Sequence, residues 1–231
     1  MNEEEARTAR RELVLPGQLL EARGLKPGNG TYSEKGSIYA SLLGIRSDRG
    51  GYVNIIPLAG KYMPEVDDEV IGMIIDLGPS HWLVDINAPY PATLHVNEVP
   101  WRVDFGDTAR FLNVKDMLLA RVFMVDEVKR VQVSMKDPRL KRLTEGQIVE
   151  VSPFKVPRVI GKKGSMISMI KNYTGCRIFV GQNGRIWISG DVEGMLDAVQ
   201  AISMIDREAQ VHGLTNSIES FLKQSKESRG K

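Results

Sequence analysis

The segment Val159-Ile160-Gly161-Lys162-Lys163-Gly164-Ser165-Met166-Ile167 has two glycines on either side of two lysines, with apolar residues at both ends. Glycine has no Cβ atom, so Gly161 and Gly164 permit a tight turn and let peptide N–H groups approach a phosphate closely. Lys162 and Lys163 add positive charge at the same place. The pattern predicts a loop that holds a sugar-phosphate backbone.

A helix is expected directly after this loop. Ser165 is placed to cap its first turn, and the helix runs to about Tyr173, before Thr174-Gly175 breaks it. The positive end of the helix dipole then faces the loop, which favours a bound anion. A Gly-x-x-Gly sequence alone is equally compatible with an ordinary turn between two helices, so the neighbouring elements decide its interpretation.

Those neighbours alternate between strand and helix patterns. A hairpin turn at 181–184 joins two alternating segments, and Asp191 is placed to cap a long helix with apolar residues at helical spacing. Those apolar residues are Val192, Met195, Leu196, Val199, Ile202 and Ile205. The remaining predicted elements are a strand at 147–151, a short helix at 154–159, and strands at 176–180 and 185–189.

This order, strand, helix, loop, helix, strand, strand, helix, resembles the KH domain from Gln147 to about Gln210. The resemblance implies that the Gly-x-x-Gly loop clamps single-stranded RNA. It also implies that Ile160, Ile167 and Ile178 border the groove for the bases, although each is equally compatible with a place in the core.

The charge distribution agrees with an RNA partner. Between Glu150 and Gly190 the chain carries one acid, Glu150, and seven bases, and such a segment suits a polyanion. The bases are Lys155, Arg158, Lys162, Lys163, Lys171, Arg177 and Arg185. The RNA site that we predict in this domain consists of Ile160, Gly161, Lys162, Lys163, Gly164, Ser165, Arg158, Lys171 and Arg177.

Composition limits the other possibilities. The 231 residues, 42% of them hydrophobic, suffice for two or three small domains, and the net charge is only +2. A single cysteine, Cys176, excludes an internal disulfide, and three histidines without a Cys-x-x-Cys motif argue against zinc or another cofactor. No apolar run reaches the length of about 18 residues that spans a membrane, so we expect a cytoplasmic protein. Residues 1–11 and 223–231 are predicted to be tails.

Residues 1–64 are predicted to form a glycine-rich β domain. Short β segments follow one another from Leu13, a turn at 48–51 precedes the segment 52–58, and Tyr62-Met63-Pro64-Glu65 is typical of a boundary. Because about fifty residues of short strands bury little area, this domain is expected to lean on a neighbour or a partner.

Residues 65–137 are predicted to form a closed β barrel. Five strands are expected, at 69–78, 81–86, 91–96, 117–125 and 130–135. Their order and the phrases at 70–74, 94–99 and 131–135 resemble the S-one type of OB fold. That resemblance implies RNA-stacking roles for Trp82, Tyr90 and His95, and a place in the core is the favoured alternative for Trp82.

The barrel is net acidic, with thirteen acids and seven bases between Glu65 and Asp137. We therefore expect it to bind RNA weakly unless its bases cluster, and we expect residues 147–231, the KH domain with a terminal helix, to supply most of the affinity. The linker Lys136–Gly146 is basic, and a solvated face is the favoured interpretation, with a role in RNA binding as the alternative because it lies between two predicted RNA-binding domains.

Two further expectations concern packing. Phe179 and Trp187 lie on the strand faces opposite the Ile178 row, so the barrel or a partner should cover them. Gly213 is placed to end the long helix, and Thr215 to cap a last helix. That helix carries Ile218, Phe221 and Leu222.

Taken together, the three domains resemble the RNA-binding cap subunit of the archaeal exosome, most clearly at 36–41, 56–58, 84–92 and 160–164. The resemblance implies three copies on a hexameric ring of ribonuclease PH-like subunits, docked through the amino-terminal domain, which guide RNA 3′ ends into the ring. No catalytic cluster of residues is evident, so we expect no enzymatic activity. A transcription elongation or ribosome-associated factor is the alternative. The phosphorolytic nuclease itself is a third class, for whose catalytic domains the chain has no room.

Overall fold

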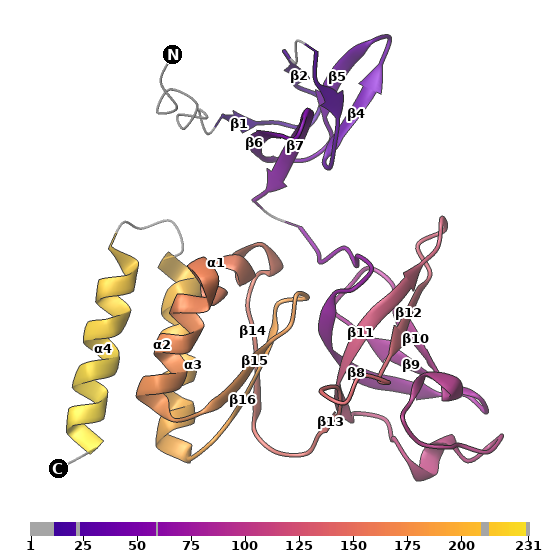
Figure 1. Cartoon of the computed structure of the whole chain (residues 1–231), viewed down its shortest axis with the longest axis vertical. Coiled ribbons are helices and arrows are strands. Elements are labelled where there is room, and N and C mark those ends of the chain that lie inside the picture. The colour runs from indigo at the N-terminus through magenta and orange to yellow at the C-terminus, as the bar shows by residue number, and fades with distance from the viewer. Residues whose placement is uncertain (1–11, 22–23, 59, 209–212, 230–231) are drawn as a thin grey trace. The chain divides into compact units, whose positions relative to one another are not determined.

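The computed structural model describes residues 12–21, 24–58, 60–208 and 213–229, and the predicted tail 1–11 lies outside them. The chain divides into two compact units, residues 1–60 and residues 61–231 (Figure 1). This division falls just before the predicted boundary at Tyr62–Glu65. The second unit contains both the barrel and the KH domain.

The amino-terminal unit consists of two small sheets around a small core. One sheet has the order β1-β6-β7-β3, and the other has the order β2-β5-β4. The strands are β1 (Leu13–Val14), β2 (Leu19–Leu20), β3 (Lys26–Pro27), β4 (Thr31–Glu34), β5 (Ser37–Ala40), β6 (Gly44–Arg49) and β7 (Tyr52–Pro57). The buried core is Val14, Leu20, Ile38, Ala40, Val53 and Ile55. So small a core fits the expectation that this unit is marginal alone.

Five strands close into the predicted barrel. They are β8 (Glu69–Leu77), β9 (His81–Asp85), β10 (Ala92–His95), β11 (Met117–Val125) and β12 (Val131–Ser134). The order β12-β10-β9-β8-β11 is closed by pairing of β11 with β12, and only the β10–β12 pair among these is parallel. Alternate residues point inward, so Trp82, Val84, Ala92 and Leu94 are fully buried. The OB-type barrel is confirmed.

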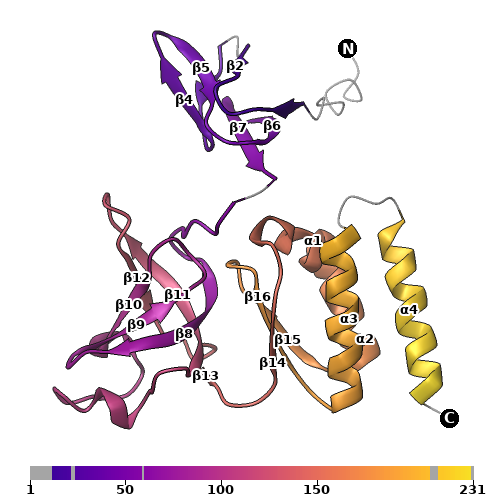
Figure 2. The same ribbon diagram turned by 180° about the vertical axis from the view of Figure 1, so that it is seen from behind.

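The KH domain has an antiparallel sheet of order β14-β16-β15, with helices α2 and α3 packed on one face of it and α4 packed on the outer side of these two helices (Figure 2). Its elements are β14 (Gln147–Glu150), α1 (Val156–Ile160), α2 (Ser165–Thr174), β15 (Arg177–Val180), β16 (Arg185–Ser189), α3 (Val192–Glu208) and α4 (Leu214–Arg229). Ile170, Ile186, Ile188 and Ile202 are completely buried in its core. The predicted order of elements is confirmed.

The starts of α2 and α3 differ from one another. Asp191 caps α3 as predicted, because its carboxylate accepts the Gly194 N–H at 2.8 Å. Ser165 does not cap α2: the helix begins at Ser165 itself, Gly164 precedes it in the left-handed conformation, and no side chain caps it.

The predicted apolar face of α3 is wrong at its first turn. Val192 and Leu196 are 69% and 59% exposed. The buried face instead carries Gly194, Ala198, Ala201, Ile202 and Ile205. Glycine and alanine at three of these positions let the helix approach its neighbours closely. The buried face of α3 is therefore the face that carries the alanines, and the larger Val192 and Leu196 side chains remain exposed.

The last helix starts earlier and ends later than predicted. Because α4 begins at Leu214, Thr215 lies inside its first turn and is not the cap. The predicted tail from Lys223 is wrong as far as Arg229, since Lys223 pairs with Glu219 at 2.8 Å within the helix. Gly213 was predicted to end α3. Residues 209–212, between α3 and Gly213, lie outside the described ranges, so this role stays a prediction.

The barrel covers the second face of the KH sheet. Trp187 is only 8% exposed and belongs to the barrel's apolar cluster, against which Phe179 and Ile148 also pack. The indole N–H of Trp187 donates to the Glu145 carbonyl at 2.6 Å. The expectation that the barrel or a partner covers Phe179 and Trp187 is confirmed for the barrel.

The linker is partly built into this unit rather than wholly solvated. Leu140 is buried, and Arg142–Leu143 forms strand β13 beside β11. The guanidinium of Arg142 also donates to Asp116 at 2.7 Å.

Candidate nucleic-acid interface

The loop between α1 and α2 is a single tight turn, Lys162–Gly164, and three residues in it or directly before it have a positive φ angle. The φ angles of Gly161, Lys163 and Gly164 are 75°, 54° and 78°. A Cβ atom at Gly161 would lie 2.7 Å from the Cβ and the N atoms of Met166, whereas one at Gly164 would meet nothing within 4 Å. Gly161 is therefore required by packing, and Gly164 leaves an open surface over the turn.

Lys162 and Lys163 are both exposed, and among the described residues neither lysine forms an ion pair with an acidic side chain. The start of α2 lies directly beside them. Because no side chain caps this helix, N–H groups of its first turn remain to bind an anion. Positive charge, uncapped N–H groups and a missing side chain thus coincide at one turn, and that combination suits a phosphate.

The other predicted basic residues divide into two sets. Arg158 on α1 and Lys171 on α2 are exposed. Arg177 is exposed too, but it lies over the Trp187 ring, 5.9 Å from its centroid, on the sheet face that turns away from the helices. The structure therefore does not bring Arg177 to the loop.

Two bases of this segment serve the structure instead. Lys155 pairs with Asp206 at 3.1 Å. Arg185 is buried between the domains. The free positive charge is thus concentrated around the loop.

The isoleucines lie at different depths. Ile160 and Ile167 are half-buried at the two ends of the loop and pack on the core. Ile178 is 6% exposed, which makes it a core residue rather than the border of a groove.

The barrel has a groove of about 450 Å³ on its outer face. Tyr90, 63% exposed, and His95 both line it. The Nδ1 atom of His95 accepts the Asn97 N–H at 3.2 Å, which fixes the ring. Trp82 is 0% exposed inside the barrel, so its predicted stacking role is wrong and its core role is confirmed.

Three residues of this groove were missed from the sequence. Lys129, Arg130 and Gln132 line it beside Tyr90 and His95. Gln132 lies opposite Thr93 in the β10–β12 pair, and the Asp126 carboxylate accepts the Arg130 N–H at 2.7 Å, which shapes the hairpin. The sequence signal was a basic pair at the start of the predicted fifth strand. These two bases give an acidic barrel a local positive site.

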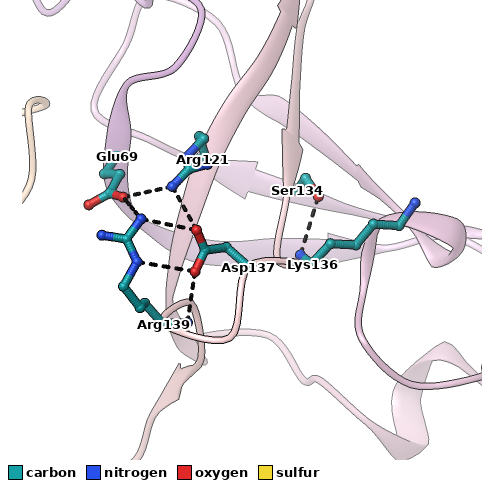
Figure 3. Close-up of polar contacts among 6 residues, drawn as sticks. All are labelled: Glu69, Arg121, Ser134, Lys136, Asp137 and Arg139. Atoms are coloured by element: carbon teal, nitrogen blue, oxygen red, sulfur yellow. Dashed lines mark hydrogen bonds and ion pairs between the residues drawn. The ribbon is translucent and has the colours of Figure 1, made fainter.

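Several acidic residues of the barrel form ion pairs that stabilise the fold. The Glu69 and Asp137 carboxylates share the guanidinium groups of Arg121 and Arg139, with contacts of 2.8 to 3.1 Å (Figure 3). Hydrogen bonds from Arg139 hold the pKa of Asp137 well below its usual range. This cluster, on β8, β11 and the start of the linker, binds the linker to the barrel.

The KH hairpin turn inserts into the barrel. Asn183 is fully buried, and its side-chain amide donates to the carbonyls of Ile71 and Ile86 at 2.8 and 2.9 Å. Arg185 donates to Asp85 at 2.6 Å and to Glu150 at 2.9 Å. Burial lowers the pKa of Arg185, but these hydrogen bonds outweigh it and the net pKa is raised. The loop and the groove are consequently held on one body.

Neither a metal cluster nor a membrane helix occurs in the described ranges. No three His, Cys, Asp or Glu side chains gather there as metal ligands would. None of the helices described is both long and apolar enough to cross a bilayer.

An OB-type barrel joined to a KH domain, each with exposed bases beside its binding surface, defines an RNA-binding protein of the S1–KH class. Family models match three parts of the chain: "Exosome complex exonuclease RRP4 N-terminal region" at 13–47, "RRP4, S1 domain" at 61–124 and "KH domain" at 146–194. The Exosome complex component Rrp4 of Picrophilus torridus is 43% identical over 94% of each chain. That of Methanosarcina mazei is 49% identical over 92% of this chain and 82% of its own.

A solved structure of a protein named as an exosome complex RNA-binding protein superposes with a TM-score of 0.69 at 38% identity. It covers 74% of this chain and 99% of its own. The chain belongs to the Rrp4 family of exosome complex components.

Proposed function

We propose that this protein is the RNA-binding cap subunit of an exosome, which captures single-stranded RNA and guides its 3′ end into a phosphorolytic ribonuclease ring. The observation that carries the proposal is the turn at Gly161–Gly164, which has a glycine at each end, two exposed lysines between them and the uncapped start of α2 directly after it. The barrel groove with Tyr90 and Lys129 supplies a second RNA contact on the same body.

In the proposed mechanism, one set of residues binds the RNA phosphates and another set stacks on the nucleobases. Lys162, Lys163 and the first turn of α2 bind phosphate groups, and Arg158 and Lys171 add to the positive field around them. Tyr90 and His95 stack on bases, which is tolerant of sequence because every base has a π-face. Such a surface holds many RNA sequences, as a degradation complex requires.

The amino-terminal unit is proposed to dock on the ring. The support is its surface, which exposes more large apolar side chains than its core buries. Leu13, Leu15, Leu19 and Ile56 are each more than half exposed. A hexameric ring of ribonuclease PH-like subunits with three copies of this chain is the proposed assembly, and the cytoplasm is the proposed location.

We further propose that the chain has no nuclease activity of its own. The support is that the relatives are named as components of a complex and that the matched domains are RNA-binding ones. The name of the amino-terminal family model includes the word exonuclease. The purified chain should therefore be incubated with labelled RNA, magnesium and phosphate. Intact RNA is expected, and shortening from the 3′ end would contradict this part of the proposal.

Mass measurement of the native complex isolated from cells tests the assembly. The expected mass is that of a six-membered ring plus three copies of this chain. Isolation with RNA polymerase or a ribosomal subunit in place of ring proteins would instead support a transcription or translation factor.

A further inference from the structure

We propose that the barrel loop Trp101–Asp107 is a further contact for single-stranded RNA, in which Phe105 stacks on one base and Arg102 binds the adjacent phosphate. This inference rests on the proposed RNA-binding function. Phe105 is 83% exposed, more than any other large apolar side chain in the described ranges. A ring so exposed contributes little to the core, and its face is open to a base from solution.

The loop is fixed to the barrel rather than loose. Its Gly106 N–H donates to the Pro79 carbonyl at 2.8 Å, and the buried Thr108 hydroxyl donates to the Gly78 carbonyl at 2.8 Å. At the base of the loop, Trp101 stacks on Phe111 with ring centroids 6.1 Å apart. The tip is thus held in one shape, so stacking on Phe105 would require little further ordering.

The loop continues the outer face that carries the groove. His95 of the groove lies directly opposite His81 in the β9–β10 pair, so both rings are on the same face. The ring of His81 lies on Gly78, the residue whose carbonyl accepts from Thr108. One connected row therefore runs from the groove through His95 and His81 to the loop.

The residues around Phe105 do not form the contiguous apolar patch that a protein-docking site needs, because its neighbours Arg102, Asp104 and Asp107 are charged. Of these three, Arg102 is the group that can bind a phosphate. Arg102 is 92% exposed and lies 3.4 Å from an Asp104 carboxylate that is itself 71% exposed. An ion pair this exposed is weak and can exchange its partner for a phosphate.

The test uses the full chain and a labelled oligoadenylate of about 16 nucleotides, the upper site size of an OB fold. Phe105→Ala is expected to weaken binding by about fivefold or more, as loss of one stacked base does, and Phe105→Tyr to restore it. The salt dependence should stay unchanged in both. Arg102→Gln should reduce the slope of log K against log salt by about 0.7. Phe123→Ala, a barrel phenylalanine outside the groove, is the matched control.

A second readout is the fluorescence of Phe105→Trp, which added RNA should quench beyond the change seen in the parent chain. Unchanged RNA affinity of Phe105→Ala would overturn the inference, even if that variant lost a protein partner. Loss of binding in Lys162→Asp/Lys163→Asp alongside that result would leave the proposed function standing. Absence of RNA binding by the parent chain would overturn both.

Discussion

The side-chain amide of Asn183 pairs with the peptide group of Ile71 across the junction of the two RNA-binding domains. The Ile71 N–H donates to Oδ1 at 3.3 Å, and Nδ2 donates back to the Ile71 carbonyl at 2.8 Å. An amide fits this double pairing because it presents a donor and an acceptor side by side. One residue of the KH hairpin thus fixes the barrel beside it.

Replacing Asn183 by Ala should lower the free energy of unfolding by about 3 kcal/mol. The substitution removes the side-chain partners of the Ile71 N–H and the Ile86 carbonyl, and each buried group left unpaired costs about 1–3 kcal/mol. The Ile71 carbonyl keeps only the 3.5 Å hydrogen bond from Arg185. Urea unfolding measures the change. Gln182→Ala is the matched control, because Gln182 is in the same turn but exposed. Equal stability of the two variants would show that the amide pair does not hold the junction.

The arginine–carboxylate cluster of Figure 3 should make stability depend on pH in the acid range. Because the pKa of Asp137 is lowered in the folded protein, the unfolded chain takes up its proton first, near the ordinary value of about 3.9. Stability from this group is therefore present above about pH 4 and is lost as the pH falls below it.

Asp137→Asn should remove the part of the stability loss below about pH 4 that comes from protonation of this carboxylate. Thermal unfolding is measured at several pH values, with Glu127→Gln as the control, since Glu127 is exposed. A parent chain and an Asp137→Asn variant that decline in parallel below about pH 4 would contradict the assignment.

The two glycines of the loop should respond differently to alanine. Gly161→Ala should lower stability by about 3 kcal/mol, since it combines left-handed strain of about 1–2 kcal/mol with a clash against Met166. Gly164→Ala should cost only about the strain, yet weaken RNA binding because its methyl group stands over the turn. Chemical unfolding and RNA titration on both variants separate the effects. Equal loss of stability would refute the distinction.

Tyr90 and Trp82 of the barrel should also respond differently to replacement by alanine. Tyr90→Ala should weaken RNA binding by about fivefold or more with no change in stability, because the ring is exposed in the groove. Trp82→Ala should destabilise the barrel by about 3–5 kcal/mol, as expected for a buried aromatic. Fluorescence anisotropy with RNA and urea unfolding give the two numbers. A destabilised Tyr90→Ala with unchanged RNA affinity would reverse the assignment.

The sequence predicted the elements of this fold well because its signals were local. Strand alternation located the barrel strands, and the Gly-x-x-Gly loop with its flanking elements located the KH domain. The same alternation showed that Phe179 and Trp187 needed a cover, which the barrel provides.

What the sequence did not predict depends on contacts between distant segments. Lys129 and Arg130 belong to the groove only because β12 pairs with β10, and Arg185 leaves the RNA surface only because Asp85 lies opposite it. The exposed Val192 and Leu196 were misplaced because alanines with weaker hydrophobic signals form the packed face of α3. A charge count along the chain cannot distinguish these paired bases from free ones.

The joined core also changes how the two RNA surfaces should be compared. Because Trp187 lies in the barrel's apolar cluster, separating the domains would expose it, and the isolated pieces would not represent the intact protein. The prediction that the KH loop supplies most of the affinity is therefore tested by substitutions in the full chain.

The most direct measurement is the salt dependence of RNA binding for the full chain and for Lys162→Asp/Lys163→Asp. If the loop holds the phosphate backbone, the variant should bind every RNA sequence more weakly and lose about 1.4 from the slope of log K against log salt, about 0.7 for each lysine. The control, Lys115→Asp/Lys226→Asp, makes the same change in charge at exposed positions outside the two RNA surfaces. An affinity and slope of the loop variant equal to those of the control would contradict the account.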